Sequence, residues 1–349
     1  MKKVLLATTA LIGFAGAAAA EISLSGYAEI GVNGGNDPAF DTQFHNDWQV
    51  NFNFSGETDG GLSFGGSVQI EESNSQDLIN GTPRIDDEAF WVSGSFGKVT
   101  LGETKGALDW AVPDIFSGTS LSDDHSTHAG AYWNTGLDGG YDDQIARYEY
   151  SFGDWGVAVS VEMDDRQTSA FIPAVPSTGP GDVGTAAIPA YTQGDPTVGI
   201  GVKWAGQMGG ADANAGIGYQ DNGDVSTWAL AGHAKWGNGF EVSLGYADFD
   251  SSATTAITDY VGNGVAVDSW AGIGVAYTTG ALTVGANYGI YSATLAGVDD
   301  PKGFGLVANY DLGGGAVAMF GYGASSGGNY DAFNGHGDKT WSAGLGMSF

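Results

Sequence analysis

The chain has 349 residues, of which 41 are acidic, 11 are basic and none is cysteine. Its formal charge of −30 excludes the basic surface that nucleic-acid binding requires, and the lack of thiols excludes disulfides and thiol chemistry. Sixty glycines would suggest disorder, but 10 Trp, 15 Tyr and 17 Phe argue for a folded chain, because disordered chains avoid aromatic residues.

The first twenty residues have the pattern of an export signal. Lys2 and Lys3 precede an apolar stretch at 4–14, and alanines at 18–20 offer a cleavage site. We therefore expect residues 1–20 to be removed, which changes the formal charge from −30 to −32 and leaves 21–349 as one domain. The alternative is a transmembrane anchor, but this segment is short and a polar strand pattern follows it.

From residue 21 onward, apolar and polar residues alternate with the period of two that is typical of β-strands. Residues 48–54 (WQVNFNF) illustrate the pattern, with one apolar and one polar face. The predicted strands are 21–33, 44–57, 61–73, 87–96, 98–104, 144–152, 155–165, 197–206, 211–221, 225–237, 240–250, 268–279, 281–292, 302–312, 316–326 and 339–349.

Short turns alternate with long polar connections along these strands, which is typical of an outer-membrane β-barrel. The longest connection is 105–143. A soluble β-sandwich is the alternative, but polar residues fill the second face of most strands and we find no second apolar set for an internal core. The pattern therefore predicts an all-β, 16-stranded antiparallel transmembrane barrel. Aromatic residues near the short turns fit an interfacial girdle: Trp155, Trp204, Trp236, Phe240 and Tyr277.

Three segments resemble the general porins of Gram-negative bacteria, above all the α-proteobacterial type. They are 21–27 (EISLSGY), 94–104 (GSFGKVTLGET) and the last strand, which ends on Phe349. The resemblance implies a homotrimer of barrels in outer-membrane lipid, each a passive diffusion pore narrowed by a third loop, here 105–143, that folds into the lumen. It also implies that Phe349 is an assembly signal. Members of the family often line one side of the pore with basic side chains. Two departures weaken that expectation here, since Glu103 and the uncharged Gln49, Asn51 and Asn53 stand where relatives often carry basic residues.

A narrow pore sorts ions by the charges that line it. The acidic candidates lie in the long loop: Asp109, Asp114, Asp123 and Asp124, with Asp138, Asp142 and Asp143 further on. Strand parity turns Arg147 toward the lumen at the height of the loop, and turns Lys203 and Lys235 inward nearer the periplasmic rim. Arg84 is a further possible wall residue, because the parity of its strand is ambiguous. Each loop acid could equally be a solvated surface carboxylate.

Signals for other chemistry are few. The segments 61–65 and 323–327 match G-x-S-x-G, but a nucleophile elbow requires a strand, a turn and a helix. His125 and His128 beside two aspartates could hold a metal or serve a hydrolase. Paired acids at 142–143, 164–165 and 299–300 could bind Ca²⁺, although no EF-hand spacing is present. We expect no cofactor.

The predicted function is passive diffusion of ions and small hydrophilic solutes across the outer membrane, with a preference for cations. Three alternatives remain open at this point. A substrate-selective porin would need an aromatic track or a densely basic lumen, an outer-membrane hydrolase would need an assembled catalytic group, and a structural or adhesin barrel would have a plugged lumen. The outer membrane is the expected location in each case.

Overall fold

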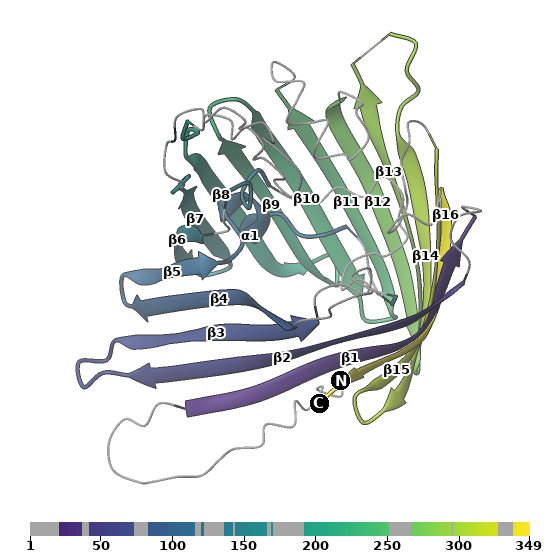
Figure 1. Ribbon diagram of the computed structural model, residues 1–349, viewed down its shortest axis with the longest axis horizontal. Helices are drawn as coiled ribbons and strands as arrows, with labels where there is room; N and C mark the ends of the chain where they lie inside the picture. The colour runs from purple at the N-terminus through teal and green to yellow at the C-terminus, as the bar shows by residue number, and fades with distance from the viewer. Residues whose placement is uncertain are drawn as a thin grey trace, which may run out of the picture.

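The computed structural model describes residues 21–36, 42–72, 83–115, 120–121, 136–141, 144–165, 169, 192–250, 267–294, 296–326 and 338–349. These residues form sixteen antiparallel strands that close into one barrel, with each strand paired to its neighbours in sequence and β1 paired to β16 (Figure 1). The predicted fold class is confirmed. The predicted signal peptide, 1–20, lies outside the described residues.

The strands are β1 Glu21–Gly35, β2 Gln43–Glu57, β3 Ser63–Glu72, β4 Pro83–Gly94, β5 Gly97–Glu103, β6 Gln144–Phe152, β7 Trp155–Glu162, β8 Thr197–Met208, β9 Ala211–Asp221, β10 Ser226–Trp236, β11 Phe240–Phe249, β12 Val267–Thr279, β13 Leu282–Ala293, β14 Lys302–Gly313, β15 Ala316–Ser326 and β16 Lys339–Ser348. One short helix, α1 (Ala107–Ala111), follows β5. No helix in the described part of the chain is long and apolar enough to cross a membrane.

Three predicted strands, 144–152, 211–221 and 316–326, match the observed bounds of β6, β9 and β15. The alternation succeeded because each strand has one face toward lipid and one toward a lumen, so its two sets of side chains differ in polarity. The exposed side chains on the outer face are large and apolar, and the girdle candidates Trp155, Phe240 and Tyr277 are 42–49% exposed beside the short turns.

The fourth strand starts four residues earlier than predicted, and a β-bulge explains why its parity was ambiguous. The β3–β4 register shifts between Ser67 and Gln69, and Asp87 adopts a left-handed φ of 52°. An extra residue on one strand reverses the alternation beyond it. Ile85 therefore faces outward before the bulge and Phe90 after it, with 66% and 51% exposure.

The expectation that the chain has no second set of apolar residues for an internal core is wrong. Part of the wall from β10 to β13 carries apolar side chains inward, and residues of the long connection pack against them. The buried cluster comprises Leu108, Val112, Ile115, Val225, Ala229, Ala231, Ala247, Phe249, Val267, Trp270 and Tyr291. Small alanines that alternate with large lipid-facing residues gave no sign of a second apolar set, because their partners lie in a segment far away in sequence.

Candidate functional site: the loop inside the barrel wall

The connection after β5 returns to the inner surface of the wall. Helix α1 contacts β7, β8 and β9, and its residues Ala107, Leu108 and Ala111 are buried. The Ala107 amide donates a hydrogen bond of 2.8 Å to Oγ of Ser160. Ser160 faces the lumen, because its strand neighbour Val159 is 49% exposed on the outer face. In Figure 1 the helix lies within the curve of these strands. Residues 116–119, 122–135 and 142–143 lie outside the description, so the full inward course of 105–143 stays a prediction.

Two buried side chains of the wall bind the returning half of this connection. Gln220 is fully buried, and its Oε1 accepts a hydrogen bond of 2.5 Å from the Leu137 amide. Glu162, 1% exposed, accepts backbone hydrogen bonds from Gly139 at 2.8 Å and Tyr141 at 3.1 Å. Such charge-assisted bonds are stronger than neutral ones. The strands β7 and β9 thus fix residues 137–141.

Asp138 joins the two ends of the connection. Its Oδ2 accepts a hydrogen bond from the Gly106 amide at 2.5 Å, and its Oδ1 accepts one from Nε2 of Gln220 at 2.5 Å. Burial raises the pKa of Asp138 above its usual value, and this effect outweighs the hydrogen bonds from Gln220 and Gly106, which lower it. We call Gly106, Asp138, Glu162 and Gln220 the latch.

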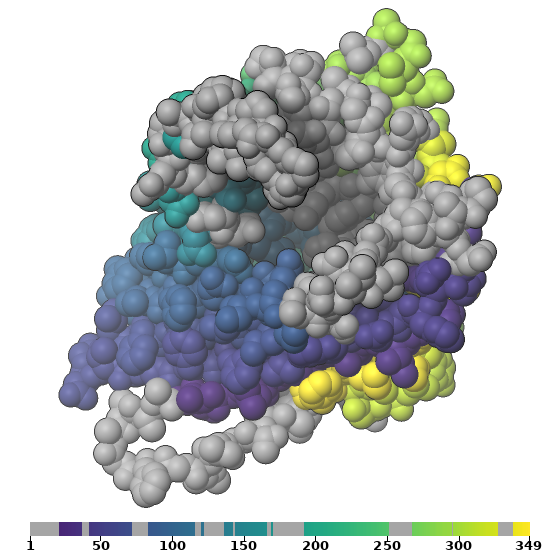
Figure 2. All heavy atoms as spheres, viewed as in Figure 1, coloured from purple at the N-terminus to yellow at the C-terminus, as the bar shows by residue number. Residues whose placement is uncertain are grey.

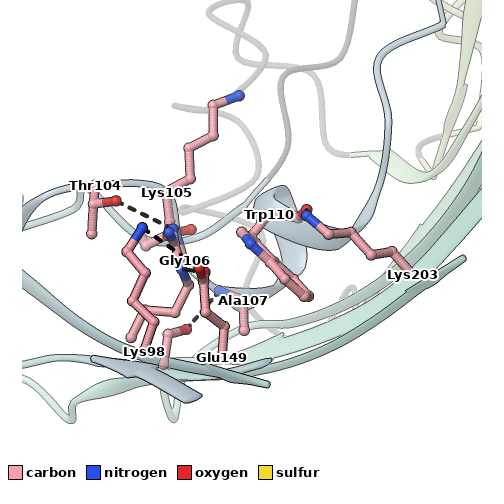
Figure 3. Close-up of polar contacts among 11 residues, drawn as sticks. Lys98, Thr104, Lys105, Gly106, Ala107, Trp110, Glu149 and Lys203 are labelled. Carbon is pink, nitrogen blue, oxygen red and sulfur yellow. Dashed lines mark hydrogen bonds and ion pairs between the residues drawn. The ribbon is translucent and has the colours of Figure 1, made fainter. Parts of the chain in front are cut away.

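Arg147 lies at the base of the connection and is 7% exposed. Its Nε donates to Glu149 at 3.1 Å, and one terminal nitrogen donates to Oγ1 of Thr104 at 3.2 Å and to the carbonyl oxygen of Lys105. Lys98 adds a second cation 3.6 Å from Glu149, and both side chains are labelled in Figure 3. Arg147 therefore binds the start of the loop, and its role as a wall charge opposite the loop acids stays a prediction.

A cavity of about 490 Å³ lies beside α1 and brings three predicted residues together, namely Asp109, Asp114 and Lys203. Asp109 forms an ion pair with Lys105 at 3.3 Å. The Lys203 ammonium donates a hydrogen bond of 3.1 Å to the carbonyl oxygen of Trp110 and lies 3.5 Å from its indole centroid, a cation–π contact (Figure 3). Charge of both signs thus meets an aromatic surface here.

The other predicted site residues are dispersed. Lys235 pairs with Glu241 on the neighbouring strand. Arg84 pairs with Glu71 at 2.7 Å and with Asp86 at 2.5 Å, and it shares the inner face with Glu71. Asp123 and Asp124 lie outside the described residues.

Sequence reasoning missed the residues that hold the loop. Trp110, Ser160, Glu162 and Gln220 carry no motif, although strand parity places Ser160 and Glu162 on the polar face. Parity indicates only that a residue faces inward. It does not indicate which loop atom the side chain contacts, because the loop residues that contact Ser160, Glu162 and Gln220 lie far away in sequence.

The enzyme-like motifs lie in the barrel wall. Segment 61–65 runs from a turn into β3, and residues 323–326 belong to β15, so neither forms a strand–turn–helix elbow.

Within the described ranges no group of three or more His, Cys, Asp or Glu could hold a metal ion. Carboxylates of Asp164 and Asp300 accept hydrogen bonds from the amides of Gly194 and Ala293. His125, His128, Asp142 and Asp143 lie outside the description.

A closed barrel with a large apolar outer surface and a polar, charged lumen is the architecture of an outer-membrane channel, because all backbone groups are paired and alternate residues face lipid. Figure 2 shows the molecule hollowed behind the wall that β1–β5 form, drawn in purple to blue.

Comparison with known proteins gives the family. The model of the Gram-negative porin family matches residues 7–330. A porin of Rhodobacter capsulatus is 32% identical over 311 residues, which cover 86% of this chain and 93% of that protein. The chain belongs to the Gram-negative porin family and is a diffusion channel of the outer membrane.

Solved structures agree on the fold. A porin structure refined at 1.8 Å resolution matches with a TM-score of 0.65 and 25% identity, covering 94% of this chain and all of the other. A double mutant of Rh. blastica porin matches with a TM-score of 0.63 and 19% identity over the same shares. The resemblance read from three sequence segments is therefore confirmed over nearly the whole chain.

Proposed function

We propose that the channel prefers cations over anions and has no enzymatic activity. The observation that supports the preference is the pairing of basic side chains in the described wall and loop. Five of them lie within 3.6 Å of a carboxylate oxygen: Arg84, Lys98, Lys105, Arg147 and Lys235. Their positive charge is balanced locally, so the excess of acidic residues determines the sign of the potential.

The strength of this field depends on salt. Exposed charges act over a Debye length of about 8–10 Å at physiological ionic strength, so the excess of acidic residues should concentrate cations at low salt and less so at high salt. An acidic surface that is unrelated to transport would give the protein the same net charge. The two cases differ in whether substitutions at the loop change ion selectivity.

Reversal potentials of the purified channel in a salt gradient test the preference. Asp109→Asn and Asp114→Asn should each lower it, whereas Arg147→Ala should raise it, because it removes one of the two cations beside Glu149 and leaves only Lys98 there. Asp59→Asn, in the exposed turn before β3, is a matched control that should leave selectivity unchanged. Anion selectivity, or no shift in any loop variant, would refute the proposal.

The chain also has an outer face suited to a homotrimer. Ile22, Leu24 and Ile30 on β1 are 50–64% exposed, and the small Ala28 between them would allow close approach of another barrel. Unheated protein should then migrate as an SDS-resistant oligomer. A monomer with native strand content in light scattering would contradict the trimer.

A substrate-selective porin remains the second candidate, because the cavity beside α1 combines Trp110 with Lys203 and Asp114. Liposome swelling distinguishes the two. Rates that fall smoothly with solute size support general diffusion, whereas saturation by one solute supports selectivity. Absence of hydrolysis by the detergent-solubilised protein would support a channel without enzymatic activity. Calcium binding at the acidic outer loops remains a hypothesis that calcium titration can test.

A further inference from the structure

Three of the glycine pairs that face the lumen from directly opposite positions on neighbouring strands also contact the long connection. The pairs are Gly201 with Gly218 on β8–β9, Gly245 with Gly272 on β11–β12, and Gly31 with Gly344 on β1–β16. Each pair contacts a different part of 105–143. The channel function does not by itself require glycines at these positions.

The first pair lies against the backbone of α1. A β-carbon at Gly201 would lie 2.0 Å from the carbonyl oxygen of Ala107, and one at Gly218 would lie 2.7 Å from Cα of Leu108. The neighbouring Gly216 is tighter still, at 1.8 Å from the carbonyl oxygen of Ala111. The helix therefore rests directly on the wall backbone, and any side chain here would push it into the lumen.

The second pair receives the side chain of Ile115, which is 4% exposed. A β-carbon at Gly245 would lie 2.8 Å from its Cγ2, and one at Gly272 would lie 2.5 Å from its Cδ1. Trp270 flanks both glycines. Since Asp114 directly precedes Ile115, this contact also fixes where the Asp114 carboxylate enters the cavity.

The third pair receives Leu121, which is fully buried. Its Cδ1 would lie 2.3 Å from a β-carbon at Gly31 and 2.6 Å from one at Gly344. The β8–β9 and β1–β16 pairs are separated by six strands on either route around the barrel, β10–β15 or β2–β7. The described anchor points of the loop therefore lie on opposite sides of the lumen.

We propose that these three glycine pairs are seats that position the loop across the pore and thereby set its width and the location of Asp109 and Asp114. A missing side chain on the wall lets a loop atom approach the strand backbone, so the glycines determine how far the loop projects into the lumen. They are positioning residues for diffusion. The inference does not depend on the sign of the ion preference.

The test on the first seat uses Gly201→Ala and Gly216→Ala. Because the β-carbon would lie within 2.0 Å of helix carbonyl oxygens, α1 must move inward by at least about 1 Å. We expect lower single-channel conductance and a smaller exclusion limit for neutral sugars in liposome swelling. Gly232→Ala is the control, since the nearest atom to its β-carbon lies at 3.5 Å. Equal conductance in the control and both variants would overturn the proposal.

A double-mutant cycle on the second seat separates positioning from a general structural defect. Gly245→Ala should lower conductance by displacing Ile115, and Ile115→Ala should suppress that loss, because no side chain then occupies the seat. Additive effects of the two substitutions would contradict the seat. A defect of the wall itself would persist in the double variant.

A further pair of variants leaves the wall unchanged, which keeps the proposal testable if a glycine variant fails to assemble. Ile115→Ala and Leu121→Ala each empty one seat without altering a strand. We expect normal barrel assembly, a raised open-channel current noise and a shifted exclusion limit, because one anchor of the loop is lost. Unchanged noise and an unchanged limit in both would overturn the proposal.

Discussion

Glu162 should control whether the returning half of the loop stays on the wall. Its carboxylate is 1% exposed and accepts the amides of Gly139 and Tyr141. Leaving one buried N–H without an acceptor costs about 1–3 kcal/mol. Glu162→Gln keeps one acceptor oxygen and loses one bond, whereas Glu162→Ala loses both and should cost about 2–6 kcal/mol.

A cost of about 1–3 kcal/mol shifts an equilibrium between latched and released loop by about 5-fold to 150-fold. Limited proteolysis with a protease of broad specificity reads this equilibrium, because cleavage within 136–141 follows the released population when opening is fast. The cleavage rate should rise by that factor in the glutamine variant and further in the alanine variant. Thermal unfolding of the barrel, measured in parallel, separates loop release from loss of the fold.

Glu241→Gln is the matched control for loss of a buried lumenal carboxylate. Glu241 is 6% exposed, and its contacts include the side chains of His233 and Lys235. It should leave the cleavage rate within 136–141 unchanged. Equal rates in wild type and both Glu162 variants, or an equal rise in the control, would refute the reasoning.

Three further outcomes are expected. Burial raises the pKa of Asp138 above 3.8. The native state therefore protonates the Asp138 carboxylate at a higher pH than the unfolded chain does. The free energy of unfolding of the wild type gains from this protonation as the pH falls through the raised pKa, and the gain is complete below 3.8. The difference in unfolding temperature between wild type and Asp138→Asn should therefore widen in favour of wild type from pH 7 to acidic pH, and a constant difference would contradict it. Phe349→Ser should lower outer-membrane levels but leave the conductance of assembled barrels unchanged, because its ring covers Gly26 on the outer face while its backbone pairs with β1; normal levels would count against this. Lys203→Met should raise cation preference in reversal-potential measurements, because it removes a lumenal cation whose described contacts are with Trp110; an unchanged preference would argue that Lys203 lies outside the ion path.

The barrel was predictable because its signal is local. Each strand alternates between lipid and lumen, so seven or more residues suffice to reveal it, and the ranges 144–152 and 211–221 match the observed strands. The exception is instructive. In β4 the bulge at Asp87 reverses the alternation, and a left-handed aspartate has no sequence signature strong enough to reveal it in advance.

The pore lining was only partly predictable, because it depends on contacts between distant segments. Parity correctly turned Lys203 inward, yet its contact with Trp110 joins residues 93 positions apart. Arg147 illustrates the same limit. The sequence indicates an inward cation at the height of the loop, whereas its hydrogen bonds to Thr104 and to the Lys105 carbonyl depend on where the loop begins.

The high glycine content, which in isolation suggested disorder, follows from packing on both faces of one thin wall. On the outer face, aromatic rings cover glycines: a β-carbon at Gly56 would lie 2.7 Å from the ring of Phe64, and one at Gly206 would lie 2.7 Å from that of Trp204. On the inner face, Gly216 admits the backbone of α1 instead. A wall one strand thick has no interior of its own, so close packing requires that side chains be absent where a ring or a loop lies against it. The high contents of glycine and of aromatic residues therefore have one cause, which is close packing against a thin wall. Aromatic rings pack against glycines on the outer face, and the loop packs against glycines on the inner face.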